Sequence, residues 1–167
     1  QLRDAWMYHI RDRVWLATAY FIPPWKLRRA LRRAARRGVD VRLLLPGPHS
    51  DHPAVRHMGS RYYERLLRDG VRIFEYQPRF IHAKALLCDG WLSIGSSNAD
   101  RWNYRWNLEA NQELRDGPLP EEIQALFEED FAHSAEFDYA HWQRRSWWRR
   151  AREWFWGRVV LLLAWFS

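Results

Sequence analysis

The sequence contains little cysteine and no long hydrophobic run, and both absences narrow the range of functions. Cys88 is the single cysteine in 167 residues, which excludes an internal disulfide and a cysteine-based metal cluster. The apolar run 159–166 has eight residues, whereas a helix that spans a bilayer needs about 20. Only Asp51 stands at ligand spacing beside His49 and His52, so we expect neither a metal nor a cofactor.

The length fits one domain that is large enough to bury a substantial core. A hydrophobic content of 47% is ordinary for a globular protein, but 12 tryptophans are not. The chain opens with Gln1 instead of methionine and shows no signal peptide, so we expect it to be a fragment of a longer protein.

The net charge of +7 is unevenly distributed along the chain. Residues 143–167 contain six arginines and only Glu153 as an acidic residue, which leaves about +2 for the rest. A nucleic-acid-binding domain more often spreads its positive charge around a groove. The concentration in one terminal segment therefore favours an anionic lipid as partner, and we expect no nucleic acid.

Residues 81–98 carry the clearest chemical signal. They predict a strand, a tight turn at Asp89-Gly90 and a second short strand that ends in a Gly-Ser-Ser-Asn loop. Alternate residues of a strand share a face, so His82 and Lys84 point together while the other face is apolar. With the hydroxyl of Ser96 and the amide of Asn98, these groups suit a phosphate. The alternative is a histidine and a lysine that are simply solvated at a sheet edge.

The spacing HxKxxxxD followed by GSxN resembles the signature of the phospholipase D superfamily. This resemblance implies that His82 is a nucleophile or general acid and that Lys84 and Asn98 hold the phosphate. It places Ser96 in the same pocket and gives Asp89, which we group with the catalytic residues, a mainly structural, charge-orienting role. The segment between Asp89 and the GSxN loop is one residue shorter than the superfamily pattern, which affects the loop.

Two further runs are similar to bacterial cardiolipin synthases of the phospholipase D type, in their carboxyl-terminal half. They are Tyr20-Phe21-Ile22-Pro23 and Asn107-Leu108-Glu109-Ala110-Asn111, and a cardiolipin synthase B-like branch fits best. The resemblance implies that Glu109 bonds the second ring nitrogen of His82 and fixes its tautomer. The alternative is an ordinary hydrogen-bonded glutamate on a polar sheet face.

The order of elements predicts an α/β fold, a mostly parallel mixed sheet flanked by helices, as in phospholipase D. Strands at 14–20, 39–45 and 71–76 alternate with helices at 25–37 and 54–69, and a further helix is predicted at 120–137. The arginines of the 25–37 helix form either a solvated surface or a phosphate-binding patch.

Ligands of open α/β sheets bind beyond the carboxyl ends of the strands. We therefore expect Tyr20, His49 and His52 to form walls of the pocket that holds His82. The alternative for the two loop histidines is that they are ordinary loop residues.

We divide the chain into a phospholipase D-like domain, 1–141, with one HxKxxxxD…GSxN motif, and a basic, Trp-rich helical tail, 142–167. Tryptophan and arginine alternate in this tail, and both suit the headgroup region of a membrane. The tail is therefore predicted to lie at the membrane interface. The alternative is a terminal helix that docks its aromatic residues on the domain.

The resemblance implies phosphatidyl transfer of the cardiolipin synthase type through a phosphohistidine. One histidine attacks phosphorus and a second protonates the leaving alcohol. This chain supplies one of the two motifs, so it requires a missing amino-terminal half or a second copy. In two-motif relatives the carboxyl-terminal histidine usually serves as the acid, a role that would fall to His82.

The same resemblance implies phospholipid substrates, with phosphatidylglycerol foremost. It also implies an anionic membrane surface as partner and a peripheral location on the cytoplasmic face of the bacterial inner membrane. Three alternatives remain. They are a phospholipase D that uses water, a single-motif endonuclease that acts as a homodimer, and a non-catalytic fragment that binds lipid or phosphate.

Overall fold

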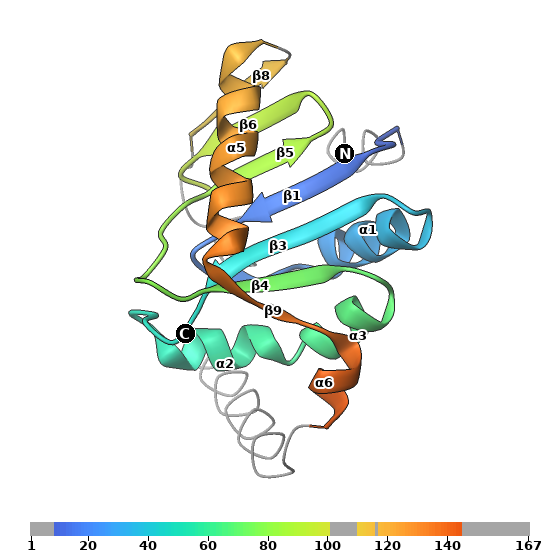
Figure 1. The fold of residues 1–167 in the computed structure, drawn as a ribbon, viewed down its shortest axis with the longest axis vertical. Helices are drawn as coiled ribbons and strands as arrows, with labels where there is room; N and C mark the ends of the chain where they lie inside the picture. Colours follow the sequence, from blue (N-terminus) through green and yellow to red (C-terminus); the bar gives the residue numbers. More distant parts are fainter. Residues whose placement is uncertain (1–8, 101–109, 116, 145–167) are drawn as a thin grey trace.

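The computed structural model describes residues 9–100, 110–115 and 117–144, which form a mixed sheet with helices on both faces (Figure 1). The strands are β1 (Arg13–Ala17), β2 (Phe21–Ile22), β3 (Asp40–Pro46), β4 (Arg72–Tyr76), β5 (Ala85–Cys88), β6 (Trp91–Gly95), β7 (Ala99–Asp100), β8 (Asn111–Arg115) and β9 (Ser134–Phe137). The helices are α1 (Trp25–Arg36), α2 (Pro53–Ser60), α3 (Tyr63–Arg68), α5 (Pro118–Ala132) and α6 (Tyr139–Gln143).

The main sheet has seven strands in the order β8-β6-β5-β1-β3-β4-β9, and β2 pairs with β7 in a separate ribbon. The predicted α/β class and the flanking helices are confirmed. Parallel pairing within the main sheet is limited to β1, β3 and β4, whereas the other neighbours pair antiparallel. The sheet is thus less parallel than expected, because a hairpin such as β5–β6 can only join antiparallel strands.

Alternate residues of the central strands point to opposite faces and build two cores. Val14, Leu16 and Leu43 pack beneath α1, α3 and α6, together with Leu31 and Leu66. On the other face, Trp15, Ala17 and Leu44 pack beneath α5, which crosses the front of the sheet in Figure 1. Helices α1 and α5 therefore lie on opposite faces of the sheet.

The helix predicted at 54–69 is two helices, so this prediction is wrong in its continuity. Helix α2 ends at Ser60, whose hydroxyl donates to the carbonyl of His57, and α3 starts at Tyr63. A side chain at Gly59 would collide with the carbonyl oxygen of Phe21 in β2. The close packing on β2 and the competing hydroxyl bond account for the break.

The helix predicted at 120–137 ends five residues early, and 134–137 form the edge strand β9 instead. This strand pairs antiparallel with β4, from Ile73↔Phe137 to Tyr76↔Ser134. Without β9, the outer edge of β4 would leave a row of backbone groups unpaired. Phe137 also packs against Tyr63 and Trp142, so the strand covers one side of the core beneath α1, α3 and α6.

Trp142, the first tryptophan of the predicted tail, is 4% exposed and belongs to the core of the domain. Its ring lies 5.1 Å from that of Tyr63. The remainder of the tail, from residue 145, lies outside the described residues. Within the described ranges, no helix is long and apolar enough to cross a membrane.

Candidate functional site

The topology brings several predicted site residues to one edge of the sheet, where β1, β3 and β4 end; we call this the site edge. Strand β5 runs against β1, with Ala85 opposite Ala17, so β5 begins at that edge. Strand β6 runs back and ends there, with Ile94 opposite Ala85. Strand β8 starts there, with Asn111 opposite Gly95. The HxK segment before β5 and the GSxN loop after β6 therefore meet at the site edge.

His82 is exposed and lies between two aromatic rings. The ring of Tyr20 is 6.0 Å away at an interplanar angle of 83°, and the ring of Phe80 is 5.5 Å away at 64°. Both contacts are edge-on, which is a favourable arrangement for aromatic rings. The two neighbours limit the rotation of the imidazole while leaving the ring open to solvent and substrate. Phe80 was not anticipated from the sequence, although it stands only two positions before His82.

The strand predicted from residue 81 begins at Ala85, so His82 and Lys84 lie in the segment that leads into β5. Ala83 is exposed, whereas Ile81 and Ala85 pack against the core beneath α5, so the expected apolar face is only partly buried. The ammonium of Lys84 donates to the carbonyl of His82 at 3.2 Å. This bond folds the Lys84 side chain back along the segment and holds its ammonium beside the backbone of His82.

The GSxN loop is bound to the start of β8. The amide of Ala110 donates to the hydroxyl oxygen of Ser96 at 3.0 Å, and the amide of Ser97 donates to the side-chain oxygen of Asn111 at 3.3 Å. A side chain at Gly95 would collide with the carbonyl oxygen of Ala110, which explains the glycine at this place. Ser96 thus ties two segments of the site edge together through its hydroxyl.

Thr18 is a site-edge residue that the sequence reading missed. It is 1% exposed, and its hydroxyl accepts the amide N–H of Ala99 at 3.0 Å and donates to the carbonyl of Tyr20 at 3.0 Å. The side-chain oxygen of Asn98 lies 3.5 Å from the same hydroxyl. Thr18 therefore fixes Tyr20 and Asn98 relative to each other. The only signal in the sequence is one hydroxyl within an apolar strand.

Replacing Thr18 by valine should lower both stability and turnover. Valine keeps the shape but leaves the buried N–H of Ala99 without its acceptor, which costs about 1–3 kcal/mol of unfolding free energy. Thr18→Ser keeps the hydroxyl and should restore turnover to near the starting value. Denaturant unfolding and initial rates of both variants measure this effect. Equal turnover in Thr18→Val and the parent protein would show that the hydroxyl positions nothing.

Tyr20 also connects the site edge to the loop that follows β3. Its hydroxyl donates to Asp51 Oδ2 at 2.7 Å, and its ring lies 5.7 Å from that of His52. His52 Nε2 is 3.9 Å from the same carboxylate oxygen. Burial and the Asp51 carboxylate raise the pKa of Tyr20 from 10.0 to about 12. The hydroxyl therefore stays protonated and the bond to Asp51 holds below pH 10, weakening only as the pH rises through about 12.

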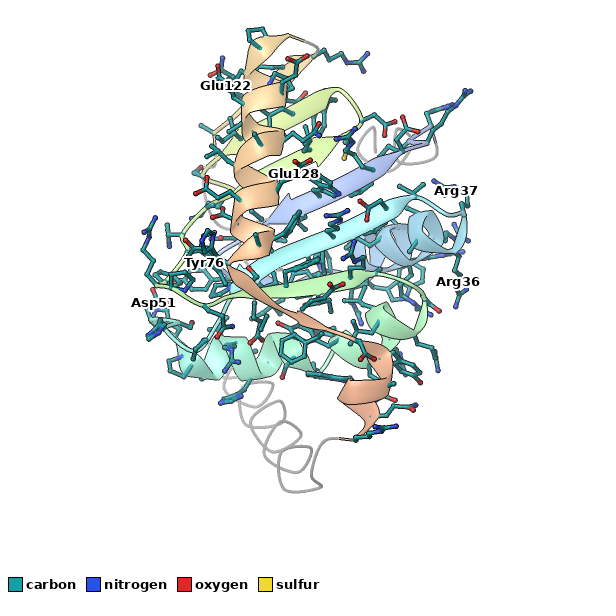
Figure 2. All side chains as sticks on the ribbon, viewed as in Figure 1. Arg36, Arg37, Asp51, Tyr76, Glu122 and Glu128 are labelled. Carbon is teal, nitrogen blue, oxygen red and sulfur yellow. The ribbon has the colours of Figure 1, made fainter. Side chains whose placement is uncertain are left out.

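Tyr20 thus lies beside His82, and His52 lies on the other side of Tyr20, one ring further from His82. His49 does not join them: it is exposed, and within the described ranges its side chain makes no hydrogen bond or ring contact. Figure 2 shows Asp51 and Tyr76 at this side of the sheet.

Asp89 lies at the opposite edge of the sheet from His82, although both belong to one motif. Its carboxylate accepts the backbone N–H groups of Arg11, Asp12 and Arg13 at 2.9–3.1 Å. The residue sits in the β5–β6 turn with a φ of 49°, in the left-handed region that aspartate tolerates. Asp89 therefore holds the entry of β1 against the hairpin, at the other end of β5 from His82 and Lys84.

Glu109, the predicted partner of the His82 imidazole, lies outside the described residues. The positions after it are placed, because Ala110 and Asn111 bond the GSxN loop at the site edge. Among the described residues, no group of three His, Cys, Asp or Glu side chains could hold a metal ion.

A family model described as "Cardiolipin synthase, PLD-like domain" matches residues 7–131. Cardiolipin synthase A of Pseudomonas aeruginosa is 42% identical over 127 residues, which cover 75% of this chain and 26% of that protein. Minor cardiolipin synthase ClsB of Bacillus subtilis is 37% identical over 151 residues, which cover 90% of this chain and 37% of that protein. The chain thus spans about a quarter to a third of the length of these relatives, which include both A and B types.

Solved structures share the fold at low sequence identity. The phospholipase D family member Nuc from Salmonella typhimurium has a TM-score of 0.70 at 17% identity, covering 82% of this chain and 89% of that one. Phosphatidylserine synthase from Haemophilus influenzae has a TM-score of 0.70 at 12% identity, covering 96% of this chain and 42% of that one. The predicted phospholipase D-like fold is therefore confirmed.

Proposed function

The chain belongs to the cardiolipin synthase, PLD-like domain family, and from that premise we propose that it carries one of the two catalytic motifs of a phosphatidyltransferase. The observation that carries the proposal is the meeting of the HxK segment and the GSxN loop at the site edge. The relatives at 36–42% identity are named cardiolipin synthases, which favours a phospholipid as donor and acceptor. Phosphatidylglycerol is the substrate that we propose for both roles.

The reaction proceeds in two displacements at phosphorus. In the first, an imidazole nitrogen forms a bond to phosphorus while the bond to the leaving glycerol oxygen breaks, and a second histidine gives that oxygen a proton. In the second, the hydroxyl of the acceptor attacks phosphorus, returns a proton to the second histidine and releases the first. His82 fills one of these two roles, and as in two-motif relatives we assign it that of the acid.

Lys84 and Asn98 stabilise the negative charge that develops on the phosphoryl oxygens. An ammonium and an amide N–H stabilise such oxygens more in the transition state than in the ground state when they are held in place beforehand. The bond from Lys84 to the His82 carbonyl and the contact of Asn98 with Thr18 supply that order before substrate binds. Glu109 is proposed to orient the His82 ring through its second nitrogen.

The direct test is product analysis with the complete protein and phosphatidylglycerol as the sole lipid. Phosphatidyl transfer should form cardiolipin and free glycerol in equal amounts, and a chelator should leave the rate unchanged because imidazole groups do the chemistry. Phosphatidic acid without cardiolipin would identify a hydrolytic phospholipase D instead. Cleavage of DNA without any lipid product would identify the single-motif endonuclease.

We also propose that the segment from residue 145 binds anionic membrane, as its arginines and tryptophans predict. Deletion of 145–167 retains the buried Trp142, so it should weaken binding to phosphatidylglycerol vesicles and flatten its salt dependence without unfolding the domain. Sedimentation with vesicles over a range of salt concentrations measures both. Unchanged binding would mean that this segment serves another purpose.

A further inference from the structure

Helix α1 and the residue that follows it carry an unusual concentration of positive charge. Residues 25–37 contain seven basic side chains and no acidic one, which equals the net charge of the whole chain, +7. The rest of the sequence therefore contains as many acidic as basic residues. Surfaces that only need to be soluble normally mix both signs.

This charge has a cost within the helix itself. Arginines at i and i+4 repel each other along α1, at the pairs 28/32, 29/33, 32/36 and 33/37. The carboxylate of Asp69 binds Arg32 and also Arg36, the latter at 2.7 Å. The seven basic side chains of residues 25–37 together create a local positive potential that an anionic surface would attract.

Aromatic side chains accompany the charge. Trp25, in the first turn of α1, is 59% exposed, more than any other large hydrophobic residue in the described part of the chain, and the guanidinium of Arg29 lies 4.9 Å from its ring. Close by on the same side of the sheet, the ring of Tyr62 is contacted by Arg28 at 4.4 Å and by Arg61 at 5.2 Å. We call this surface the Arg–aromatic face; it comprises Trp25, Lys26, Arg28, Arg29, Arg61 and Tyr62.

The opposite side of the sheet has the opposite sign. Helix α5, from Pro118 to Ala132, contains five acidic residues and no basic one. Figure 2 shows Glu122 and Glu128 on this helix in front of the sheet, whereas α1 lies behind it. An anionic surface would therefore attract one side of the molecule and repel the other, which orients the protein before contact.

We propose that the Arg–aromatic face docks on an anionic phospholipid bilayer. Arginine and lysine bind lipid phosphates, and the exposed ring of Trp25 suits the headgroup layer, whereas Tyr62 packs partly against the core and holds Arg28 and Arg61 beside its ring. Helix α1 starts shortly after Tyr20 and ends near Arg36 and Arg37, on the side of the molecule opposite the site edge, so Trp25 stands at the end of the helix that is closer to the site edge. Docking brings the site edge to the bilayer that, under the proposed function on which this inference rests, holds the substrate.

The test is vesicle binding by the complete protein, measured by flotation with mixed phosphatidylglycerol and phosphatidylcholine vesicles. The variant Lys26→Glu/Arg29→Glu changes two exposed residues of the face. The matched control, Arg11→Glu/Arg115→Glu, changes the net charge by the same amount at exposed positions away from α1. We expect the first variant to bind about tenfold or more weakly, and the control to lose less than about threefold.

Trp25→Ala tests the aromatic part, with an expected loss of about threefold that salt does not remove. If the charge-reversed variant fails to fold by circular dichroism, Lys26→Gln/Arg29→Gln replaces it with the same expected direction. An equal loss in the α1 variant and the control would reduce the effect to net charge and overturn the proposal. The proposal would also be overturned if Lys26→Glu/Arg29→Glu bound vesicles as well as the parent but lost binding to a DNA duplex at the same salt concentration.

Vesicle binding is measured without turnover, which separates this proposal from the proposed function. A protein that forms no cardiolipin but binds vesicles through the Arg–aromatic face would refute the function and leave the docking surface standing. If the parent protein forms cardiolipin but the α1 variant and the control bind vesicles as well as the parent does, the docking surface is refuted and the proposed function stands.

Discussion

Replacing His82 by alanine should abolish phosphatidyl transfer while leaving the fold intact. The imidazole is the group that we propose to protonate the leaving oxygen and to take the proton back from the acceptor hydroxyl, and losing such a group costs about 10²–10⁴-fold in rate. The side chain is exposed, and within the described part of the chain it contacts the rings of Tyr20 and Phe80, so its removal opens no cavity in the core. Initial rates and thermal unfolding of the same preparation measure the two effects.

The matched control is His9→Ala. His9 is also exposed, and it lies before β1 at the opposite edge of the sheet, so its loss should change neither rate nor stability. Comparison of the two variants separates the role of the site edge from any general effect of removing a histidine. More than a few per cent of the parent rate in well-folded His82→Ala would rule out a chemical role for this residue.

The fold could be predicted wherever local pattern and long-range pairing agree. Helix α1 has its apolar stripe at i, i+3, i+4 and i+7 and is followed by Gly38 with a φ of 90°, a left-handed conformation that glycine adopts readily. The β5–β6 hairpin turns at Asp89-Gly90, as the dipeptide predicts. These features depend on residues close in sequence.

Strand β9 was missed because its structure depends on a distant partner. Ile123, Leu126, Phe127 and Phe131 form a helical stripe, and no glycine or proline interrupts the sequence between Phe131 and Phe137, so the local pattern reads as one long helix. The unpaired edge of β4, more than 55 positions earlier in the chain, determines the outcome instead. Local propensity cannot report such a pairing, and tertiary contacts override it.

The candidate site shows the same division. The motif predicts His82, Lys84 and Asn98 as site residues, because residue types and offsets are displayed directly by a sequence. It did not reveal that Asp89 bonds backbone amides 76 to 78 positions away at the other edge. Nor did it reveal Thr18, whose hydrogen bond to Ala99 spans 81 positions. A residue can therefore belong to the motif and lie far from the site edge, as Asp89 does, or lie at the site edge without belonging to the motif, as Thr18 does. The topology of the sheet decides which.

Turnover should require a second catalytic histidine from outside this chain, which is the largest effect that the proposed mechanism predicts. One imidazole cannot both form the bond to phosphorus and protonate the departing oxygen in the same displacement. His82 is the only histidine of the sequence with a lysine two positions on, since His9, His49, His52, His57, His133 and His141 lack one. A strictly monomeric form of this chain should therefore show no turnover.

Mixing experiments test this requirement if two copies of the chain supply the two histidines. At a fixed total concentration, equal amounts of parent chain and His82→Ala chain should give about one quarter of the parent rate, because only pairs with two intact rings react. Independent sites would instead give about one half. Light scattering on the same samples reports the oligomeric state, and dilution below the dissociation constant of the dimer should remove the activity. Full turnover from a strict monomer would refute the two-histidine mechanism, because His82 would then act without a second motif histidine.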